Sequence, residues 1–521
     1  MLQTKDYKTF RVGTHIFEGA KNANKCLPGD EVEPTEAGCT LKTRSNHHVL
    51  AGLIELNSKV RYGFSSRNVP IYLFVPFNES YPPFVVGCSE KDTTKNRLAL
   101  VKFDNWLETY PRGLLQQLLP IGAEEEALFW TYTPIACLKY KGLLPPPPSM
   151  EGRRYLPALT FNIDPPDCRD VDDVISIEYT PNEEIYITIT ISDVAATIPE
   201  GHPVDLYARS IGQTFYQDGN QPKHMFPGPL SEMALSLVPG EPRAGLSLRF
   251  PLSNPSEVEW FESYVNVANS YTYDTVYGNQ LICNPLIMMA TILGQPSQDS
   301  HEWIEVAMKF YNTEAAKLIQ KAQSGFLRSH RAPDVERLQK YTAVDPALKF
   351  LAYNSATYVT ANDPNPAHWG LNAAVYTHAS SPIRRYADLV NQRVIKAYLS
   401  RSPIPMQQDP TQLNAIAKQA KKHDRDLVFV RALQENMNDQ TTGQIIDIQY
   451  IGAITKIHVF VKQWALTVKL KYLTGPEPNT VISKDEKTIY IVQIGQQIKI
   501  AYYADMTARA WKRRMVLRLC N

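Results

Sequence analysis

The chain has 521 residues and a mass of 58.9 kDa, and this length predicts about three to four domains. Its 54 Lys and Arg residues against 53 Asp and Glu leave a formal net charge of +1. This balance excludes a uniformly basic protein that binds nucleic acid by charge alone, but it is compatible with a local basic surface. Hydrophobic residues at 44% and charged residues at 21% predict a globular chain, neither disordered nor fibrous.

The sequence has no recognisable targeting, membrane or disulfide pattern. No stretch approaches the ~18 uncharged apolar residues that cross a bilayer, and the first residues carry charges where a signal peptide is apolar. The seven cysteines are scattered and include no Cys-x-x-Cys pair, which argues against a disulfide framework and a zinc ribbon. We therefore expect a soluble, cytoplasmic protein.

The pattern of apolar residues changes several times along the chain and predicts an α+β multidomain protein. Residues 1–45 look like a short piece of a small all-β barrel, and residues 46–142 alternate apolar and polar positions like a complete one. The proline run in residues 143–149 predicts a stiff connector. A large mixed domain is expected over residues 150–438 and another small barrel over residues 439–521. Helical periodicity in the mixed domain covers residues 284–293, 303–322 and 382–399.

Four aspartates lie at the ends of two predicted strands. Residues 159–163 alternate as a half-buried strand, and Asp164 falls where that strand stops. Two prolines then force a turn, and Asp170, Asp172 and Asp173 directly precede a second apolar strand. If the two strands belong to one sheet, the four carboxylates are close together.

Such a cluster needs a positive charge or a bound proton. Two like charges 4 Å apart repel by about 4 kcal/mol at an effective dielectric constant of 20, so either some carboxyls are protonated or a cation lies among them. Oxygen ligands, with only the thiol of Cys168 beside them, favour Mg²⁺ or Mn²⁺ over zinc. A solvated acidic turn is the alternative, but the flanking apolar strands attach this loop to a core.

A second segment predicts an anion site at a helix start. Ser381 followed by Pro382 is typical of a capped first turn, with Arg384 inside that turn. Free amides, the helix dipole and the guanidinium would together attract a phosphate. The alternative is a helix whose arginines pair with nearby acids. Combined with a divalent metal, the segment indicates phosphodiester chemistry.

Four motifs carry a resemblance to a known family. In chain order they are Ile163-Asp164-Pro165-Pro166-x-Cys168-x-Asp170-Val171-Asp172-Asp173, Thr214-Phe215-Tyr216, His224-Met225-Phe226-Pro227 and Thr377-His378-x-x-Ser381-Pro382-Ile383-Arg384-Arg385-Tyr386-x-Asp388-Leu389. The chain resembles the RNase II/RNase R exoribonucleases, the RNB-domain family. The Pro-Pro-x-Cys spelling favours the eukaryotic, exosome-associated branch, without its extra endonuclease domain.

The resemblance implies processive 3′→5′ hydrolysis of single-stranded RNA to nucleoside 5′-monophosphates with Mg²⁺, for which Mn²⁺ could substitute. Asp164, Asp170, Asp172 and Asp173 would hold the metal, and Asp172 would matter most for the rate.

The same resemblance assigns the RNA contacts. Arg384 would contact the scissile phosphate and act in catalysis with Asp172. Arg385 and Ser381 would also bind RNA, and Tyr216 would stack on a base near the 3′ end.

The resemblance also interprets the remaining domains. The barrels would be two cold-shock-type OB domains, the first truncated, and a C-terminal OB-fold RNA-binding domain. We expect a monomer that binds single-stranded RNA. We expect no association with a membrane. Two other functions stay open: a catalytically silent RNA-binding scaffold with the same fold, and a metal-dependent phosphatase acting on small substrates, which would leave the barrels without a purpose.

Two short segments depart from the family pattern. Ala195 and Ala196 stand where the family usually has Ser-His after Asp-Val, and Asn391 and Gln392 stand where it usually has Val-His. Neither departure alters the four aspartates or Arg384, so we expect an active enzyme.

Overall fold

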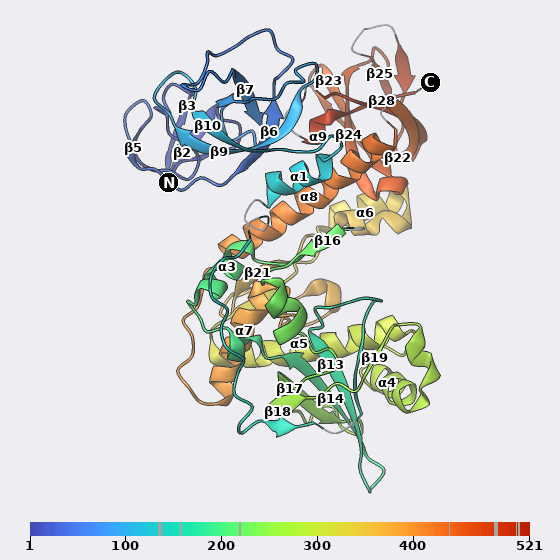
Figure 1. The fold of residues 1–521 in the computed structure, drawn as a ribbon. Coiled ribbons are helices and arrows are strands. Elements are labelled where there is room, and N and C mark those ends of the chain that lie inside the picture. The colour runs from blue at the N-terminus through green and yellow to red at the C-terminus, as the bar shows by residue number, and fades with distance from the viewer. Residues whose placement is uncertain are drawn as a thin grey trace. The chain divides into compact units, whose positions relative to one another are not determined.

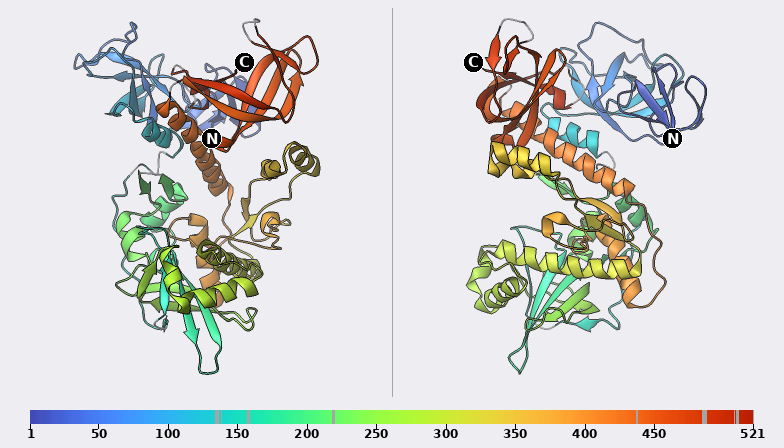
Figure 2. Two further views of the ribbon diagram at one scale, coloured as in Figure 1. Left: turned by 90° about the vertical axis from the view of Figure 1, so that its right-hand side faces the viewer. Right: turned by 180° about the vertical axis from the view of Figure 1, so that it is seen from behind.

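The computed structural model describes residues 1–133, 137, 139–156, 159–217, 220–436, 438–483, 488–506, 508 and 511–520. The chain forms two compact units, whose segments can be followed by the colours that mark residue number in Figures 1 and 2. The barrel unit comprises residues 1–137, 336–351 and 419–521, and the central-sheet unit comprises residues 138–335 and 352–418. The α+β fold class expected from the sequence is confirmed, while the domain boundaries stay predictions.

The barrel unit contains a closed five-stranded barrel with the strand order β10-β8-β7-β6-β9. Its strands are β6 (Leu50–Ile54), β7 (Ile71–Pro76), β8 (Phe84–Gly87), β9 (Arg97–Asn105) and β10 (Arg112–Leu118), followed by α1 (Glu124–Tyr132). Alternate residues of β7 are buried, among them Tyr72 and Phe74, because successive side chains of a strand point to opposite faces.

The first 43 residues share the core of this barrel. They form β1 (Gln3–Thr4), β2 (Thr9–Val12), β3 (His15–Glu18), β4 (Glu31–Pro34) and β5 (Cys39–Thr43). Phe10 and Leu27 of this segment belong to the same buried cluster as Phe74 and Phe84 of the barrel. So short a segment buries little apolar surface alone, and the shared core gives it the cover it needs.

The C-terminal part of the barrel unit is a curled seven-stranded sheet with the order β26-β25-β24-β23-β22-β27-β28. Its elements are β22 (Asn438–Ile451), β23 (Ile454–Val461), β24 (Leu466–Thr474), β25 (Thr480–Ile482), β26 (Ile489–Ile491), β27 (Gln497–Ala504), α9 (Trp511–Arg514) and β28 (Met515–Leu519). Ile457, Leu470 and Ile500 form its core with Phe429 of α8 (Thr411–Glu435). Helix α6 (Val335–Val344) is tied to β22 by the ion pair between Lys340 and Asp447.

The central-sheet unit is built on seven strands in the order β11-β18-β17-β14-β13-β12-β19. They are β11 (Arg154–Tyr155), β12 (Thr160–Ile163), β13 (Asp173–Tyr179), β14 (Ile185–Ser192), β17 (Arg243–Pro251), β18 (Glu259–Val265) and β19 (Asn269–Tyr271). The other elements are α2 (Val194–Thr197), α3 (Pro203–Ile211), β15 (Phe215–Gln217), β16 (Asn220–Lys223), α4 (Gln280–Ile292), α5 (Ser300–Ala322), β20 (Phe326–Ser329), β21 (Thr357–Thr360) and α7 (Tyr386–Leu399).

The two faces of this sheet are buried in different ways. Ile189 and Leu248 lie in one apolar cluster with Trp303 and Tyr311 of α5. Between neighbouring strands of the sheet, buried hydroxyl groups form hydrogen bonds of 2.7 Å. One bond joins Thr190 and Ser247, and the other joins Ser247 and Ser263. These small polar side chains satisfy one another, which buried hydroxyls require.

The helices largely follow the sequence pattern, with one correction. Helices α4 and α5 cover the two expected segments and begin a few residues earlier than predicted. The helix expected from Pro382 begins instead at Tyr386, because residue Arg385 is extended (φ −138°) and forms a β-bridge with Gln213. In the described part of the chain, no helix combines the length and apolar character needed to cross a bilayer.

The crowding of the central sheet gives a stability prediction. A Cβ at Gly245 of β17 would come closer to Thr190 Cγ2 than van der Waals contact allows, and would lie 2.9 Å from Ser263 Oγ. We expect Gly245→Ala to lower the free energy of unfolding by about 1–3 kcal/mol, measured as a lower urea midpoint.

The matched control is Gly228→Ala. Gly228 has a helical conformation (φ −47°, ψ −43°), and a Cβ there meets no atom within 4 Å. Its urea midpoint should equal or exceed that of the wild type, because alanine reduces the freedom of the unfolded chain. Equal midpoints for both variants would contradict the close packing described for β17.

Candidate active site

The four aspartates predicted as metal ligands gather at one end of two paired strands. Asp164 follows β12 and Asp173 begins β13, and these strands are antiparallel neighbours. Asp170 and Asp172 lie in the connecting loop and are both buried. The carboxyl of Asp173 is close enough to Asp164 and Asp172 for their charges to raise its pKa. The juxtaposition expected from the strand pattern is therefore present.

Asp172 contacts the segment that contains Arg384. Its Oδ1 accepts a hydrogen bond from the Ile383 amide at 2.8 Å, and its Oδ2 accepts one from Arg384 Nε at 3.1 Å. The Ser381 hydroxyl accepts a bond from Arg384 Nη2 at 2.9 Å and is itself buried. The amide and guanidinium that the sequence predicts for a phosphate thus hold the Asp172 carboxylate.

The turn before α7 has this shape because of contacts with a remote segment. The Thr214 amide donates to the Arg384 carbonyl and the Tyr386 amide donates to the Gly212 carbonyl, both at 2.9 Å. These bonds hold Arg385 in an extended conformation. The segment predicted to be the start of a helix with an anion site is therefore a turn that precedes α7. Asp388 in the first turn of α7 then accepts bonds from the Ser381 amide at 2.8 Å and from the Arg385 guanidinium.

Tyr216 lies beside the aspartates on the hairpin of β15 and β16. Its hydroxyl donates a hydrogen bond to Asp170 Oδ2, while the residue as a whole is 54% exposed. Burial of the hydroxyl end and the charge of Asp170 raise the pKa of Tyr216 well above its usual value. The hydroxyl is therefore anchored, and much of the ring remains accessible.

Burial dominates the electrostatics of the carboxyls. It raises the pKa of Asp172 to about 7, although Arg384 and the Ile383 amide act in the opposite direction. The pKa of Asp173 is raised well above its usual value, first by burial and then by the charges of Asp164 and Asp172. The pKa of Asp164 is raised as well, mainly by burial. Burial therefore favours the protonated, neutral form of these carboxyls, unless a cation compensates their charge.

The donor chemistry of the cluster fits a hard divalent ion, since all four side chains offer carboxylate oxygens. Among the described residues, however, no group of three or more His, Cys, Asp or Glu side chains is arranged to hold a metal ion. The hydrogen bonds above explain this in part, because they engage both oxygens of Asp172 and one oxygen of Asp170. The carboxylates would have to turn toward one another to share an ion.

Two buried asparagines hold the loop before the turn: Asn312, which the sequence analysis missed, and Asn391, which it named only as a departure from the family pattern. Asn312 of α5 donates to the Tyr376 hydroxyl and to Ser380 Oγ, both at 3.1 Å, and accepts from the Ala379 amide at 2.8 Å. Asn391 of α7 donates to Thr377 Oγ1 at 2.8 Å. The only signal in the sequence was a polar residue on an otherwise apolar helix face.

The two departures from the family pattern contact each other. Gln392 Oε1 accepts a hydrogen bond from the Ala195 amide at 2.9 Å, and its Nε2 donates to the Ser192 carbonyl at 2.7 Å. Ser192 in turn donates its amide to the Asp172 carbonyl at 2.8 Å. The substituted residues therefore satisfy each other's polar groups behind the aspartate loop.

Tyr273 is a further neighbour of the aspartates that sequence reasoning missed. Burial raises its pKa to about 12, and the charges of Asp164 and Asp173 act in the same direction. Its ring stacks on His301 with 3.6 Å between the ring centroids. No motif marks this tyrosine, because it follows β19, about 100 residues after the acidic loop.

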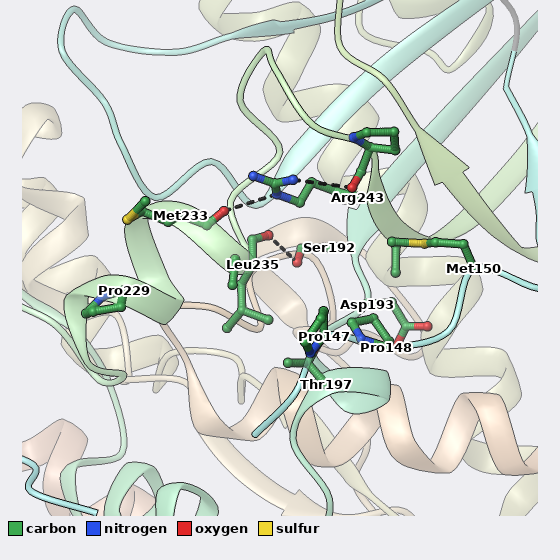
Figure 3. Close-up of a pocket in the computed structure, with 13 residues that line it drawn as sticks. Pro147, Pro148, Met150, Ser192, Asp193, Thr197, Pro229, Met233, Leu235 and Arg243 are labelled. Carbon is green, nitrogen blue, oxygen red and sulfur yellow. Dashed lines mark hydrogen bonds between the residues drawn. The ribbon is translucent and has the colours of Figure 1, made fainter. Parts of the chain in front are cut away.

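A pocket of 380 Å³ lies at the end of β14, against the proline-rich connector (Figure 3). Its lining is mostly apolar, with Met150, Met233 and Leu235 among the side chains, and it contains neither the four aspartates nor Arg384. We therefore place the candidate active site at the aspartate cluster and not in this pocket.

Comparisons with known proteins match both the sequence motifs and the fold. The family model for the RNB domain matches residues 153–286 and 341–401. Ribonuclease R of Helicobacter pylori is 24% identical over 379 residues, which cover 57% of this chain and 58% of that protein. The chain spans little more than half the length of the first curated relatives that it matches.

Two solved structures share the fold. The apo form of Mycoplasma genitalium RNase R has a TM-score of 0.70 at 16% identity, with 98% of each chain covered. Yeast Ssd1, described as a pseudonuclease, has a TM-score of 0.64 at 15% identity, covering 96% of this chain and 87% of that one. At these identities the likeness concerns the fold alone.

The mixed central sheet with clustered aspartates, accompanied by a closed OB-like barrel, defines a protein of the RNase R fold class. The RNB-domain match over residues 153–286 and 341–401 and the RNase R and exoribonuclease 2 relatives support the resemblance to the RNase II/RNB family. The closer resemblance of the chain to the eukaryotic, exosome-associated branch of this family stays a prediction.

The raised pKa of Asp172 predicts the pH dependence of stability in metal-free buffer. Between its unfolded value of 3.8 and about 7, the folded chain binds a proton that the unfolded chain releases. Stability present below pH 4 is therefore lost as pH rises through 7, by at most about 4 kcal/mol. In EDTA, Asp172→Asn should lose less stability than wild type between pH 5 and pH 8, as measured by urea unfolding.

Asp167→Asn is the matched control, because Asp167 is an exposed acid of the same loop. It should follow the wild-type profile. A profile for Asp172→Asn as steep as that of the wild type would contradict the assigned environment of Asp172.

Proposed function

We propose that this chain is a 3′→5′ exoribonuclease that degrades single-stranded RNA processively to nucleoside 5′-monophosphates. The observation that carries the proposal is the RNB-domain match together with the contact of Asp172 and Arg384, which unites both signature motifs in one site. Curated relatives named ribonuclease R and exoribonuclease 2 support the same reaction class.

Arg384 is the residue we assign to the reacting phosphate. Its side chain is 44% exposed, whereas that of Asp172 is 2% exposed, so the guanidinium presents one edge outward while Nε faces the carboxylate. A phosphate that arrives at this edge would receive charge-assisted hydrogen bonds. Asp172 fixes the orientation of the Arg384 guanidinium through Nε. The Ser381 hydroxyl accepts a hydrogen bond from Nη2 and holds the same orientation.

The aspartates are the residues that would hold Mg²⁺, or Mn²⁺ in its place. When bound, the ion would supply positive charge that activates water and stabilises the developing charge on the phosphate oxygens. The raised pKa values of Asp164 and Asp173 support this assignment, because crowded carboxyls in a buried loop bind a cation favourably. Tyr216 would stack on a base through its exposed ring.

The proposals for the RNA partner and the cellular location rest on a structure of a fold neighbour with RNA and on the cysteines. Mycoplasma genitalium RNase R, which shares the fold, has been solved in complex with ribose-methylated single-stranded RNA. The barrels of this chain would guide such a strand, as OB folds do. The described cysteines form no disulfide, in agreement with the reducing, cytoplasmic location that we propose, and we propose a monomer.

A catalytically silent RNA-binding scaffold is the second candidate. Two observations favour it: the fold is shared with yeast Ssd1, described as a pseudonuclease, and Asp172 engages the groups expected to bind phosphate. In this case the chain would bind RNA through the same surface without cleaving it.

The proposal predicts the products from labelled RNA. With Mg²⁺, a 3′-labelled single strand should release labelled mononucleotide at once, whereas a 5′-labelled strand should give a short end product without a ladder if degradation is processive. EDTA should abolish both. Asp172→Asn should lower the rate by at least about 100-fold, because it removes a charged group from the reacting centre.

Asp167→Asn is again the matched control and should cleave at the wild-type rate. Equal rates for Asp172→Asn and wild type would disprove the site assignment. Tight RNA binding with no nucleotide release in either Mg²⁺ or Mn²⁺ would favour the scaffold.

A further inference from the structure

Arg328 is a partly buried cation without a counter-ion. It lies on β20 opposite Tyr358 of β21, and its Cζ is 4.5 Å from the centroid of the Tyr358 ring. Its Nη1 is buried without a hydrogen-bond partner, and in the described part of the chain no carboxylate lies within ion-pair distance of the guanidinium. Burial lowers the pKa of Arg328. A desolvated charge is unfavourable unless an anion compensates it.

Two histidines beside Arg328 also have unused nitrogens. The rings of His330 and His368 lie 5.0 Å apart, and His330 Nε2 and His368 Nδ1 are both buried without partners. His330 Nδ1 accepts a hydrogen bond from the Gly370 amide at 3.3 Å. A neutral imidazole that accepts at Nδ1 carries its proton on Nε2, so His330 has a free donor.

Two further arginines lie in the same part of the central-sheet unit as Arg328. Arg384 is paired with Asp172 and Arg385 with Asp388, whereas Arg328 adds an unpaired charge. Two histidines of this part of the unit, His368 and His378, do not add a positive charge, because their pKa values are lowered. Burial, His330 and Arg328 lower the pKa of His368 to about 4, and burial together with Arg385, Arg328, His368 and Arg384 lowers the pKa of His378 well below its usual value. Of these three arginines, Arg328 is the one with no acid within ion-pair distance among the described residues.

We propose that Arg328 and His330 bind a second backbone phosphate of the RNA, beyond the phosphate held by Arg384. The proposal rests on the proposed function, since it assigns a further subsite to the same strand. A phosphate would supply the missing negative charge and accept from both side chains. The charges of Arg328 and Arg384 both act on His378, so the two side chains lie in the same part of the central-sheet unit.

An aromatic surface beside the subsite favours a nucleotide over an isolated anion. Trp369 is 40% exposed, and its ring packs edge-on against His330, with 5.8 Å between centroids, and against Tyr353, with 5.1 Å. A fixed, accessible indole is a suitable platform for a base, and bases of any type stack on such rings. The subsite would therefore bind phosphate and base without sequence preference.

The salt dependence of RNA binding tests this subsite. Each phosphate contact on a single strand contributes about 0.7 to the slope of log K against log salt concentration. We expect Arg328→Met, which keeps an apolar stem against Tyr358, to weaken binding of a labelled oligoadenylate about tenfold at 0.1 M salt and to lower the slope by about 0.7. Arg328→Lys should keep most of the slope. Binding is measured in EDTA, so that cleavage does not interfere.

The matched control is Arg249→Met. Arg249 also lies over a tyrosine ring, with its Cζ 3.6 Å from the Tyr186 centroid, but it is paired with Glu178 at 2.7 Å. It should bind RNA like wild type. Circular dichroism checks the fold, and if Arg328→Met does not fold, His330→Gln replaces it and should weaken binding several-fold without changing the slope.

The possible results separate the subsite from the proposed function. The subsite would be overturned, even if the enzyme cleaves RNA, by Arg328→Met binding RNA with the wild-type affinity and the wild-type salt slope. If His330→Gln is used in its place, wild-type affinity of that variant would overturn the subsite. A lower slope in a protein that releases no nucleotides with Mg²⁺ would support the subsite and refute hydrolysis. No binding of RNA by the wild type would overturn both.

Discussion

The contact of Asp172 with Ile383 and Arg384 is the interaction on which the candidate site depends. Asp172 is separated along the chain from Ile383 by 211 residues and from Arg384 by 212 residues. The contact gives the buried carboxylate an amide and a guanidinium that compensate its charge. Leaving such a carboxylate unpaired would cost several kcal/mol. The position of Arg384, and therefore of any phosphate it binds, follows from where the acidic loop ends.

A set of buried polar side chains maintains this contact. Asn312 and Asn391 fasten the loop before the turn, Gln392 fastens the strand end beside Asp172, and Asp388 closes the turn itself. Buried amides and carboxylates need nearly complete hydrogen bonding, so these residues permit few other arrangements of the loop. These hydrogen bonds fix the protein side of the site, while burial raises the pKa of its carboxyls.

Local patterns predicted the parts of the structure that depend on neighbouring residues. The alternation before Asp164 and the prolines after it placed the aspartates at the ends of two strands, because strand period and turn chemistry are local properties. The same local reasoning placed a helix start at Ser381, and this was wrong. Pairing with residues 212–214 holds Arg385 extended, and no signal near Ser381 encodes that pairing.

The sequence by itself determined the α+β class, the resemblance to the RNase II/RNB family and the residue types available for chemistry. Only the tertiary structure decided which charges meet. It pairs Arg384 with Asp172 and Arg385 with Asp388, and leaves Arg328 without an acid among the described residues. A net charge of +1 conceals this uneven distribution. Electrostatic energy depends on the distance and burial of groups, and for residues far apart in the chain these quantities exist only after folding.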